Sequence, residues 1–153
     1  DLVDWRDFIR RTPEEYAAWI EGCTSECTIL ELRILEEVSQ QGKKVFVDTN
    51  IPTEVLRNIT DKDHVLIMLA DPDISVSRFF DRPDREKQFL YQLLLNEPEP
   101  DQALDNFREC LGRINSRETY NKFLDSGFHC ILRDDSRTIE ETLSLAENHF
   151  QLR

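Results

Sequence analysis

The sequence predicts an α/β fold with three layers, in which helices cover both faces of a parallel sheet and a helical lid closes over it. Three short apolar runs, at 45–47, 65–69 and 128–132, have the length and composition of buried strands. The first two lead into carboxylates, Asp48 and Asp71. Helical patterns separate the three runs, and this alternation favours parallel strands whose carboxyl ends meet at one edge, where open α/β sheets place their sites.

Two helices are expected before the first run. Thr12 is a hydroxyl cap followed by proline and two glutamates, which is a strong start for a helix. We expect this helix to stop at Gly22 and a second helix to span 25–40, where apolar residues recur at helical spacing before Gly42. Residues 2–4 are expected to end a strand. A short helix through Ile59 should lead from the first run to the second.

Helical patterns also fill the long interval between the second and third runs. Asp84, Asp101 and Ser116 are candidate caps of three successive helices. We therefore expect a helical lid at about 74–127 within a single domain that spans residues 1–153, since 153 residues with 39% hydrophobic content can bury one core. After the third run, Thr138 opens a capping box for the last helix.

The net charge and the cysteine spacing argue against several classes of function. The net charge of -12 argues against binding to nucleic acid or to a membrane surface, because both are anionic. Arginine supplies 14 of the 19 basic residues, and its planar fork suits phosphate and carboxylate groups, although ordinary surface use would explain the same excess. The four cysteines have no Cys-x-x-Cys spacing, so no metal site is expected, and reduced thiols fit a cytoplasmic protein.

From residue 43 onward, the order of motifs resembles that of the P-loop small-molecule kinases, the group of nucleoside monophosphate kinases and shikimate kinases. The run into Asp48 resembles the family's strand that ends in a functional aspartate. The run at 65–69, with the helix that follows it, resembles the entry into the family's lid. The Arg113 to Arg117 stretch resembles its arginine-bearing helix, and 128–138 resembles its last strand, base-side loop and final helix.

The resemblance implies an ATP-dependent phosphotransferase that acts on a nucleotide or another small metabolite, with ATP and Mg²⁺ as cofactors. It implies that a carboxylate orients the acceptor while guanidinium groups neutralise the transferring phosphoryl group. The implied catalytic residues are Asp48, Arg82 and Arg85. The implied substrate-binding residues are Asp4, Arg6, Thr49, Asn50, Arg113 and Arg117. The implied nucleotide-binding residues are Arg78, Arg133 and Ser136.

Structural roles compete with each of these assignments. Asp48 could fix a loop, and Thr49 and Asn50 could form a turn. Arg78, Arg82 and Arg85 could pair with neighbouring acids, and Arg113 and Arg117 with nearby glutamates. Arg133 and Ser136 could simply belong to the loop that enters the last helix.

The sequence also departs from the family pattern, because no Gly-x-x-x-x-Gly-Lys-Ser/Thr loop is present. The resemblance therefore implies that the family's first strand and phosphate loop belong to a segment upstream of Asp1, and that ATP is not bound without them. The alternative is an acidic, non-catalytic interaction module on a kinase-like scaffold.

Overall fold

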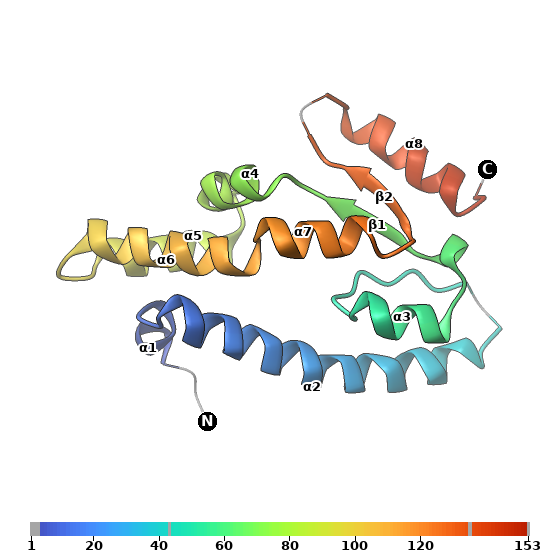
Figure 1. The fold of residues 1–153 in the computed structure, drawn as a ribbon, viewed down its shortest axis with the longest axis horizontal. Helices are drawn as coiled ribbons and strands as arrows, with labels where there is room; N and C mark the ends of the chain where they lie inside the picture. Colours follow the sequence, from blue (N-terminus) through green and yellow to red (C-terminus); the bar gives the residue numbers. More distant parts are fainter. Residues whose placement is uncertain (1–3, 43, 135, 153) are drawn as a thin grey trace.

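The computed structural model describes residues 4–42, 44–134 and 136–152, and most of them lie in helices (Figure 1). The helices are α1 (Trp5–Ile9), α2 (Pro13–Ser39), α3 (Thr53–Ile59), α4 (Pro72–Ser77), α5 (Arg85–Leu95), α6 (Pro100–Ile114), α7 (Arg117–Leu124) and α8 (Ile139–His149). Two 3₁₀ turns, η1 (Lys62–His64) and η2 (Phe79–Asp81), and two strands, β1 (Leu66–Leu69) and β2 (His129–Leu132), complete the described elements.

The two strands form one parallel sheet. Leu66 pairs with His129 and Leu69 with Leu132, so β1 and β2 are in register along their whole length. These strands confirm the second and third apolar runs of the sequence. The connection between them contains α4 to α7, which is long enough for the crossover that parallel strands require.

The predicted three-layer parallel sheet is wrong. The described part of the sheet has two strands, and the first apolar run forms none, because residues 44–50 are irregular. Val45, Phe46 and Val47 are all exposed, and the Phe46 ring touches Phe150 at a centroid distance of 5.9 Å. A short apolar run becomes a strand only when a neighbouring strand takes up its backbone hydrogen bonds. Residue 43 lies outside the described residues.

Helix α2 corrects a second expectation. The capping box at Thr12 is confirmed: its hydroxyl accepts from the backbone N–H of Glu15, and the Glu15 carboxylate accepts from the N–H of Thr12. The helix then continues through Gly22 for 27 residues, so one helix replaces the expected pair. A glycine inside a helix costs only about 1 kcal/mol relative to alanine, and the packing of α2 on α6 can outweigh that cost.

The main cluster of buried hydrophobic residues lies among α1, α2, α5 and α6, away from the sheet (Figure 1), while the sheet region buries Leu69, Phe128 and Ile131. Phe107 of α6 is 1% exposed and contacts the rings of Phe8, Tyr16, Phe79 and Phe80. The helical region at about 74–127, interpreted from sequence as a lid, therefore supplies much of this core. This cluster is formed by helices that pack on one another and not by helices that pack on a sheet. The core residues are Phe8, Ile9, Tyr16, Leu94, Leu104, Phe107, Cys110 and Leu111.

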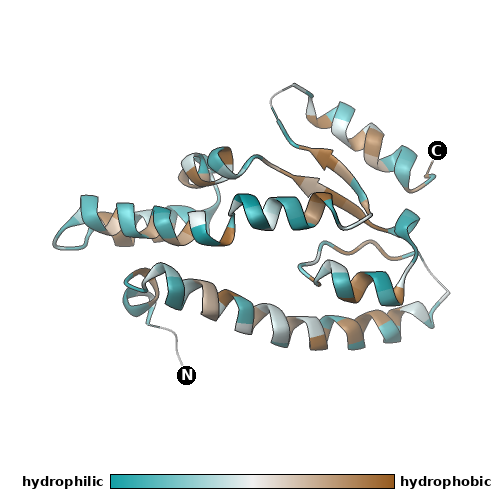
Figure 2. Ribbon diagram, in the orientation of Figure 1, coloured by the Kyte–Doolittle hydropathy of each residue, from teal (hydrophilic) through white to brown (hydrophobic). Residues whose placement is uncertain are grey.

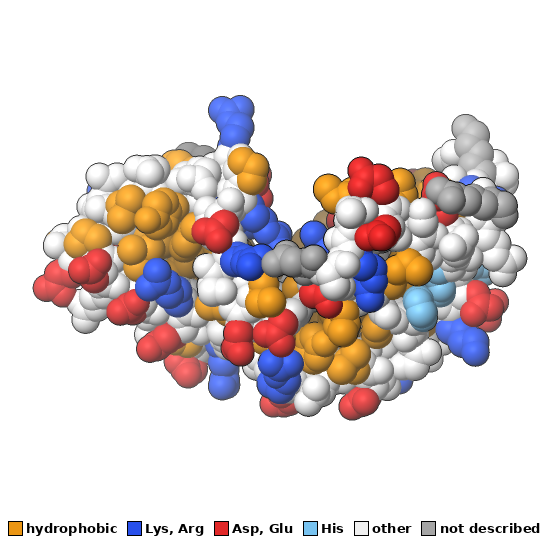
Figure 3. Space-filling model, turned by 90° about the horizontal axis from the view of Figure 1, so that it is seen from above, with side chains coloured by type: hydrophobic (Ala, Val, Ile, Leu, Met, Phe, Trp, Pro, Cys, Tyr) orange, Lys and Arg blue, Asp and Glu red, His pale blue; other side chains and the backbone are white. Residues whose placement is uncertain are grey.

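The molecule exposes a large surface for its mass. Its accessible area is 11345 Å², whereas the scaling of surface with mass gives about 8100 Å² for a compact monomer of 18.1 kDa. Hydrophobic residues are frequent in the C-terminal half of α2 and in the sheet (Figure 2), and several of them, such as Leu30, Ile34 and Met68, are exposed. Seen from above, exposed hydrophobic side chains alternate with acidic and basic ones (Figure 3). Among the described helices, none combines the length and the apolar character needed to span a membrane.

Candidate functional site

The carboxyl edge of the two-stranded sheet brings two polar segments together. Because Leu69 lies opposite Leu132, the residues that follow β1 and β2 leave the sheet at the same edge. The backbone N–H of Arg133 donates to the carbonyl of Leu69, which extends the pairing one step beyond β2. After β1, Asp71 caps α4 and accepts from the N–H of Asp73 at 3.0 Å.

An ion pair joins this edge to α7. The guanidinium of Arg117 donates to the carboxylate of Asp71 at 3.0 Å, and the same group lies over the ring of Tyr120. Arg117 is the first residue of α7, directly after the N-cap Ser116. The hydrogen bond from Arg117 lowers the pKa of the Asp71 carboxyl below its ordinary value, and the backbone N–H of Asp73 acts in the same direction. The pair is solvent-exposed on both sides.

The turn after β2 satisfies its own hydrogen bonds. The backbone N–H of Ser136 donates to the Asp134 carboxylate at 3.1 Å, and the hydroxyl of Ser136 donates to the same oxygen. These bonds lower the pKa of Asp134. The guanidinium of Arg137 donates to the carbonyl of Leu132 at 2.7 Å. The nucleotide-binding role implied for Ser136 would therefore require its hydroxyl to leave Asp134.

Asp48 lies in the loop that connects α2 to α3, and this loop contacts α2 through Thr49. Asp48 and Asn50 are exposed, and Asp48 has no hydrogen bond or ion pair with any residue that the structure describes. The hydroxyl of Thr49 donates to the carboxylate of Glu31 in α2 and accepts from the backbone N–H of Ile51 at 3.0 Å. Thr49 therefore fixes the loop to the helix, while Asp48 is left open to solvent.

The remaining candidate arginines are spread along the helices rather than gathered at the edge. Arg78 ends α4, and its backbone N–H bonds back into that helix. Arg82 follows η2, where its carbonyl accepts from Gln88, and Arg85 begins α5. Arg113 lies in the last turn of α6. Within the described residues, the side chains of Arg82, Arg85 and Arg113 form no ion pair, so the competing pairing with neighbouring acids is not seen for them.

Asp4 and Arg6 belong to α1 and not to a strand end. Asp4 caps α1 by accepting from the backbone N–H of Arg6 at 2.9 Å. Helix α1 lies beside the start of α2, at the opposite end of the molecule from the sheet (Figure 1). Residues 2 and 3, which were expected to lead a strand into Asp4, are outside the described part of the chain. The substrate-binding role implied for Asp4 and Arg6 has no support from their placement.

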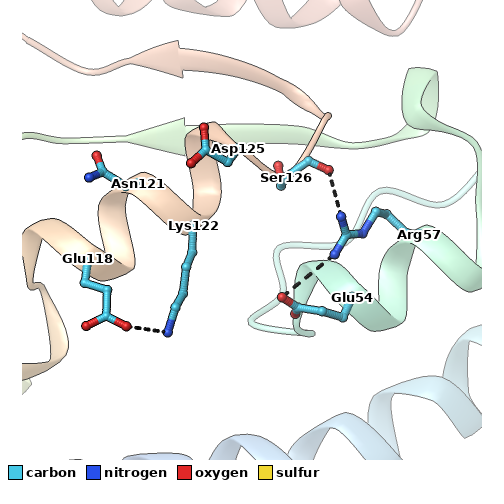
Figure 4. Close-up of a pocket in the computed structure, with 7 residues that line it drawn as sticks. All are labelled: Glu54, Arg57, Glu118, Asn121, Lys122, Asp125 and Ser126. Carbon is cyan, nitrogen blue, oxygen red and sulfur yellow. Dashed lines mark hydrogen bonds and ion pairs between the residues drawn. The ribbon is translucent and has the colours of Figure 1, made fainter.

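A pocket of about 390 Å³ lies between α3 and α7, on the side of the sheet where β2 begins (Figure 4). Arg57 reaches across it to the carbonyl of Ser126 at 3.5 Å and pairs with Glu54. Lys122 is held by Glu118 at 3.0 Å. Both cations therefore already have partners. No motif in the sequence marks these residues. The lining residues are Glu54, Arg57, Glu118, Asn121, Lys122, Asp125 and Ser126.

Neither a metal-binding cluster among the described residues nor a phosphate loop in the sequence accompanies this edge. No group of three His, Cys, Asp or Glu side chains in the described part of the chain is placed to hold a metal ion. The glycine-rich loop whose backbone amides would cradle the phosphates is absent from the sequence. No family model, curated protein or solved structure matches the chain.

The Asp71 and Arg117 pair predicts a pH dependence of stability. Because the folded-state pKa of Asp71 lies below its unfolded value, about 3.9, the ionised carboxylate stabilises the fold above that pH. This contribution is lost as the pH falls through the folded-state pKa. We expect Asp71→Asn to be less stable than the wild type in urea unfolding at neutral pH, and the difference to close on acidification. In an Arg117→Ala background the difference should be smaller, and what remains comes from the backbone N–H groups that still favour the ionised carboxylate. A gap that persists at the lowest pH would contradict the assignment.

Proposed function

We propose that this chain provides the acceptor side of a small-molecule phosphotransferase of the P-loop kinase type. The observation that supports the proposal best is the parallel pairing of β1 with β2, because it sends Asp71 and Arg133 to one edge and brings Arg117 onto that edge from α7. A guanidinium group at such an edge suits a phosphate or carboxylate of a small acceptor. The acceptor is a nucleotide or another small anionic metabolite.

The exposure of the ion pair between Arg117 and Asp71 determines how Arg117 could bind a phosphate. Such pairs are worth about 0–1 kcal/mol, so Arg117 can exchange Asp71 for a phosphate at little cost. The exchange leaves Asp71 held by the backbone N–H of Asp73. Arg117 then neutralises negative charge on the bound group. The family resemblance assigns the hydroxyl proton of the acceptor to Asp48, which is exposed and without a partner among the described residues. The neighbours of Asp48 contact α2 and Phe150 and not the Arg117 edge, so this role requires the loop at 44–50 to approach that edge when substrate binds.

A thermal-shift titration with magnesium-ATP tests the proposal. It should use the longest polypeptide that the gene encodes, because this chain has no phosphate cradle of its own. The melting temperature should rise steadily with ligand concentration, since a ligand at 100 times its Kd stabilises the folded state by about 2.7 kcal/mol. The same titration on residues 1–153 should be flat. A coding sequence without a glycine-rich loop upstream of Asp1, or a flat response from a polypeptide that contains one, would remove the proposal.

The second candidate is the acidic, non-catalytic interaction module. It is favoured by the excess of exposed area over that of a compact monomer, and by large apolar side chains at the surface. This alternative predicts association with a macromolecular partner that is independent of nucleotide. A flat magnesium-ATP titration with an intact phosphate loop would favour it.

A further inference from the structure

The side chain of His149 attaches the C-terminal end of α8 to the sheet. Its Nε2 atom lies 3.0 Å from the carbonyl oxygen of Val65, directly before β1, and donates to it because a carbonyl can only accept. The same ring stacks on His129 of β2, with 5.2 Å between the ring centroids and 14° between the planes. Figure 1 shows α8 running alongside these two strands. One imidazole therefore joins the helix to both strands.

The rest of α8 buries little surface. None of the residues Ile139–His149, all of them described, is fully buried. His149 shares a side of the helix with Thr142, Leu145 and Ala146, which precede it by seven, four and three residues. Leu145 is still 39% exposed, and the other two side chains are small. Because little apolar surface is removed from water on this side, the contacts of His149 supply a large share of the attachment.

The charge on the two stacked rings affects this attachment. Imidazole ordinarily takes up a proton at about pH 6.5. One proton on the pair is compatible with the stack, because Nε2 of His149 still donates to Val65. A proton on each ring places two positive charges 5.2 Å apart, and like charges at this distance disfavour the docked helix. The released helix therefore binds the second proton more readily, so acidification favours release.

Other ionisable groups lie beside these contacts, on α8, on β2, before β1 and in the loop at 44–50 that reaches Phe150. They are Lys44, Asp48, Asp63, His64, Cys130 and Glu147. Carboxylates, thiols and lysine ordinarily keep one charge state between about pH 5.5 and 7.5. His64 is the other imidazole of the set, and its ring is hydrogen-bonded to Thr60 at 3.3 Å. A variant of His64 can therefore serve as a control.

We propose that the stacked pair of His129 and His149 makes the attachment of α8 to the sheet sensitive to pH. At neutral pH at least one ring is uncharged, and the helix is docked. Below about pH 6 both rings carry a proton, and the helix leaves the sheet more often. Two charges at this separation in water change such an equilibrium by about fourfold, and by more where protein displaces water. The inference does not depend on the proposed phosphotransferase activity.

Hydrogen–deuterium exchange of the α8 amides at about pH 7.5 and about pH 5.5 tests the proposal. An isolated helix of 11 residues is marginal in water, so α8 exchanges its amides when it leaves the sheet. After correction for the intrinsic pH dependence of exchange, we expect the protection of α8 to fall about fourfold or more at the lower pH. The protection of α6, which lies in the main cluster, should not change. Equal protection of α8 at both pH values overturns the proposal.

Two variants assign the effect to the histidine pair. His129→Phe keeps a ring for stacking but cannot be charged, so α8 should be equally protected at both pH values. His149→Gln keeps a side-chain N–H for the Val65 carbonyl and leaves one imidazole, so it should also remove the pH dependence, with lower protection throughout because the stack is lost. His64→Gln is the matched control and should keep the full effect of acid. An acid effect that persists in His129→Phe, or one that His64→Gln removes, overturns the proposal.

Discussion

Replacing Phe107 by alanine lowers the free energy of unfolding by about 3–5 kcal/mol, the range measured for truncating buried aromatic residues. Phe107 is 1% exposed and is the ring on which α1, α2 and the η2 turn meet. The cavity left by the change is bordered by four other aromatic rings that cannot all move inward. Since native domains are stable by only about 5–15 kcal/mol, the loss is a large fraction of the total. Urea unfolding followed by circular dichroism measures it.

Phe46→Ala is the matched control for this prediction. It removes the same side chain from a position that is 62% exposed and touches one ring, that of Phe150. We expect a change within about 1 kcal/mol. If both variants lost similar stability, the core would not be centred on α6. If Phe107→Ala were neutral, the packing of α1, α2 and α6 would be wrong.

The helix starts could be predicted from sequence because their signals are local. Thr12, Asp84, Ser116 and Thr138 each cap the helix expected of them, and in these four cases the side-chain oxygen bonds to a backbone N–H two or three residues later. The expected cap at Asp101 is wrong, because α6 already begins at Pro100, a residue suited to the first turn, with Glu99 at the N-cap. The two strands at 65–69 and 128–132 were also found from their continuous apolar runs, although the strands are only partly buried: Met68 is 47% and Leu132 42% exposed.

The failures concern properties that depend on distant residues. Residues 45–48 have the composition of a strand, but a strand needs a neighbour, and no local signal says whether one is available. Gly22 ends a helix only where tertiary packing does not support its continuation, and here α2 continues past Gly22 and packs on α6. The wrong three-layer fold follows from the first of these errors. The prediction counted a strand at 45–48 that the structure does not form, and a sheet of two strands is too small to build three layers.

The candidate site also combines features that local sequence predicts with features that depend on distant residues. The sequence implied that polar residues gather after the strands, and the register of β1 and β2 places the turns after both at one edge. It could not say which arginine reaches that edge. Arg117 pairs with Asp71, which is 46 residues away, rather than with the nearby glutamates that local spacing suggests. Arg57, which crosses the pocket between α3 and α7, had no sequence signal at all.

Asp48→Asn should reduce the turnover of the longest encoded polypeptide by about 10²–10⁴-fold, the usual contribution of a general base. The amide keeps the shape of the side chain but cannot take up a proton. Asp48 is exposed and has no hydrogen bond or ion pair within the described residues, so its substitution should leave the melting temperature unchanged. A coupled assay of phosphate transfer to a panel of small acceptors measures the rate.

The control separates a chemical role for Asp48 from a general effect of charge. Asp61→Asn removes the same charge from another exposed position, next to η1, and should leave turnover unchanged. If Asp48 only fixes a loop, its replacement would alter stability rather than rate, because loop-fixing aspartates act through hydrogen bonds to the backbone. In this structure that work is done by Thr49, which bonds to both Glu31 and Ile51. Unchanged turnover in Asp48→Asn, with the fold intact, would therefore leave Asp48 without a role in the site and would remove the proton acceptor from the phosphotransferase proposal.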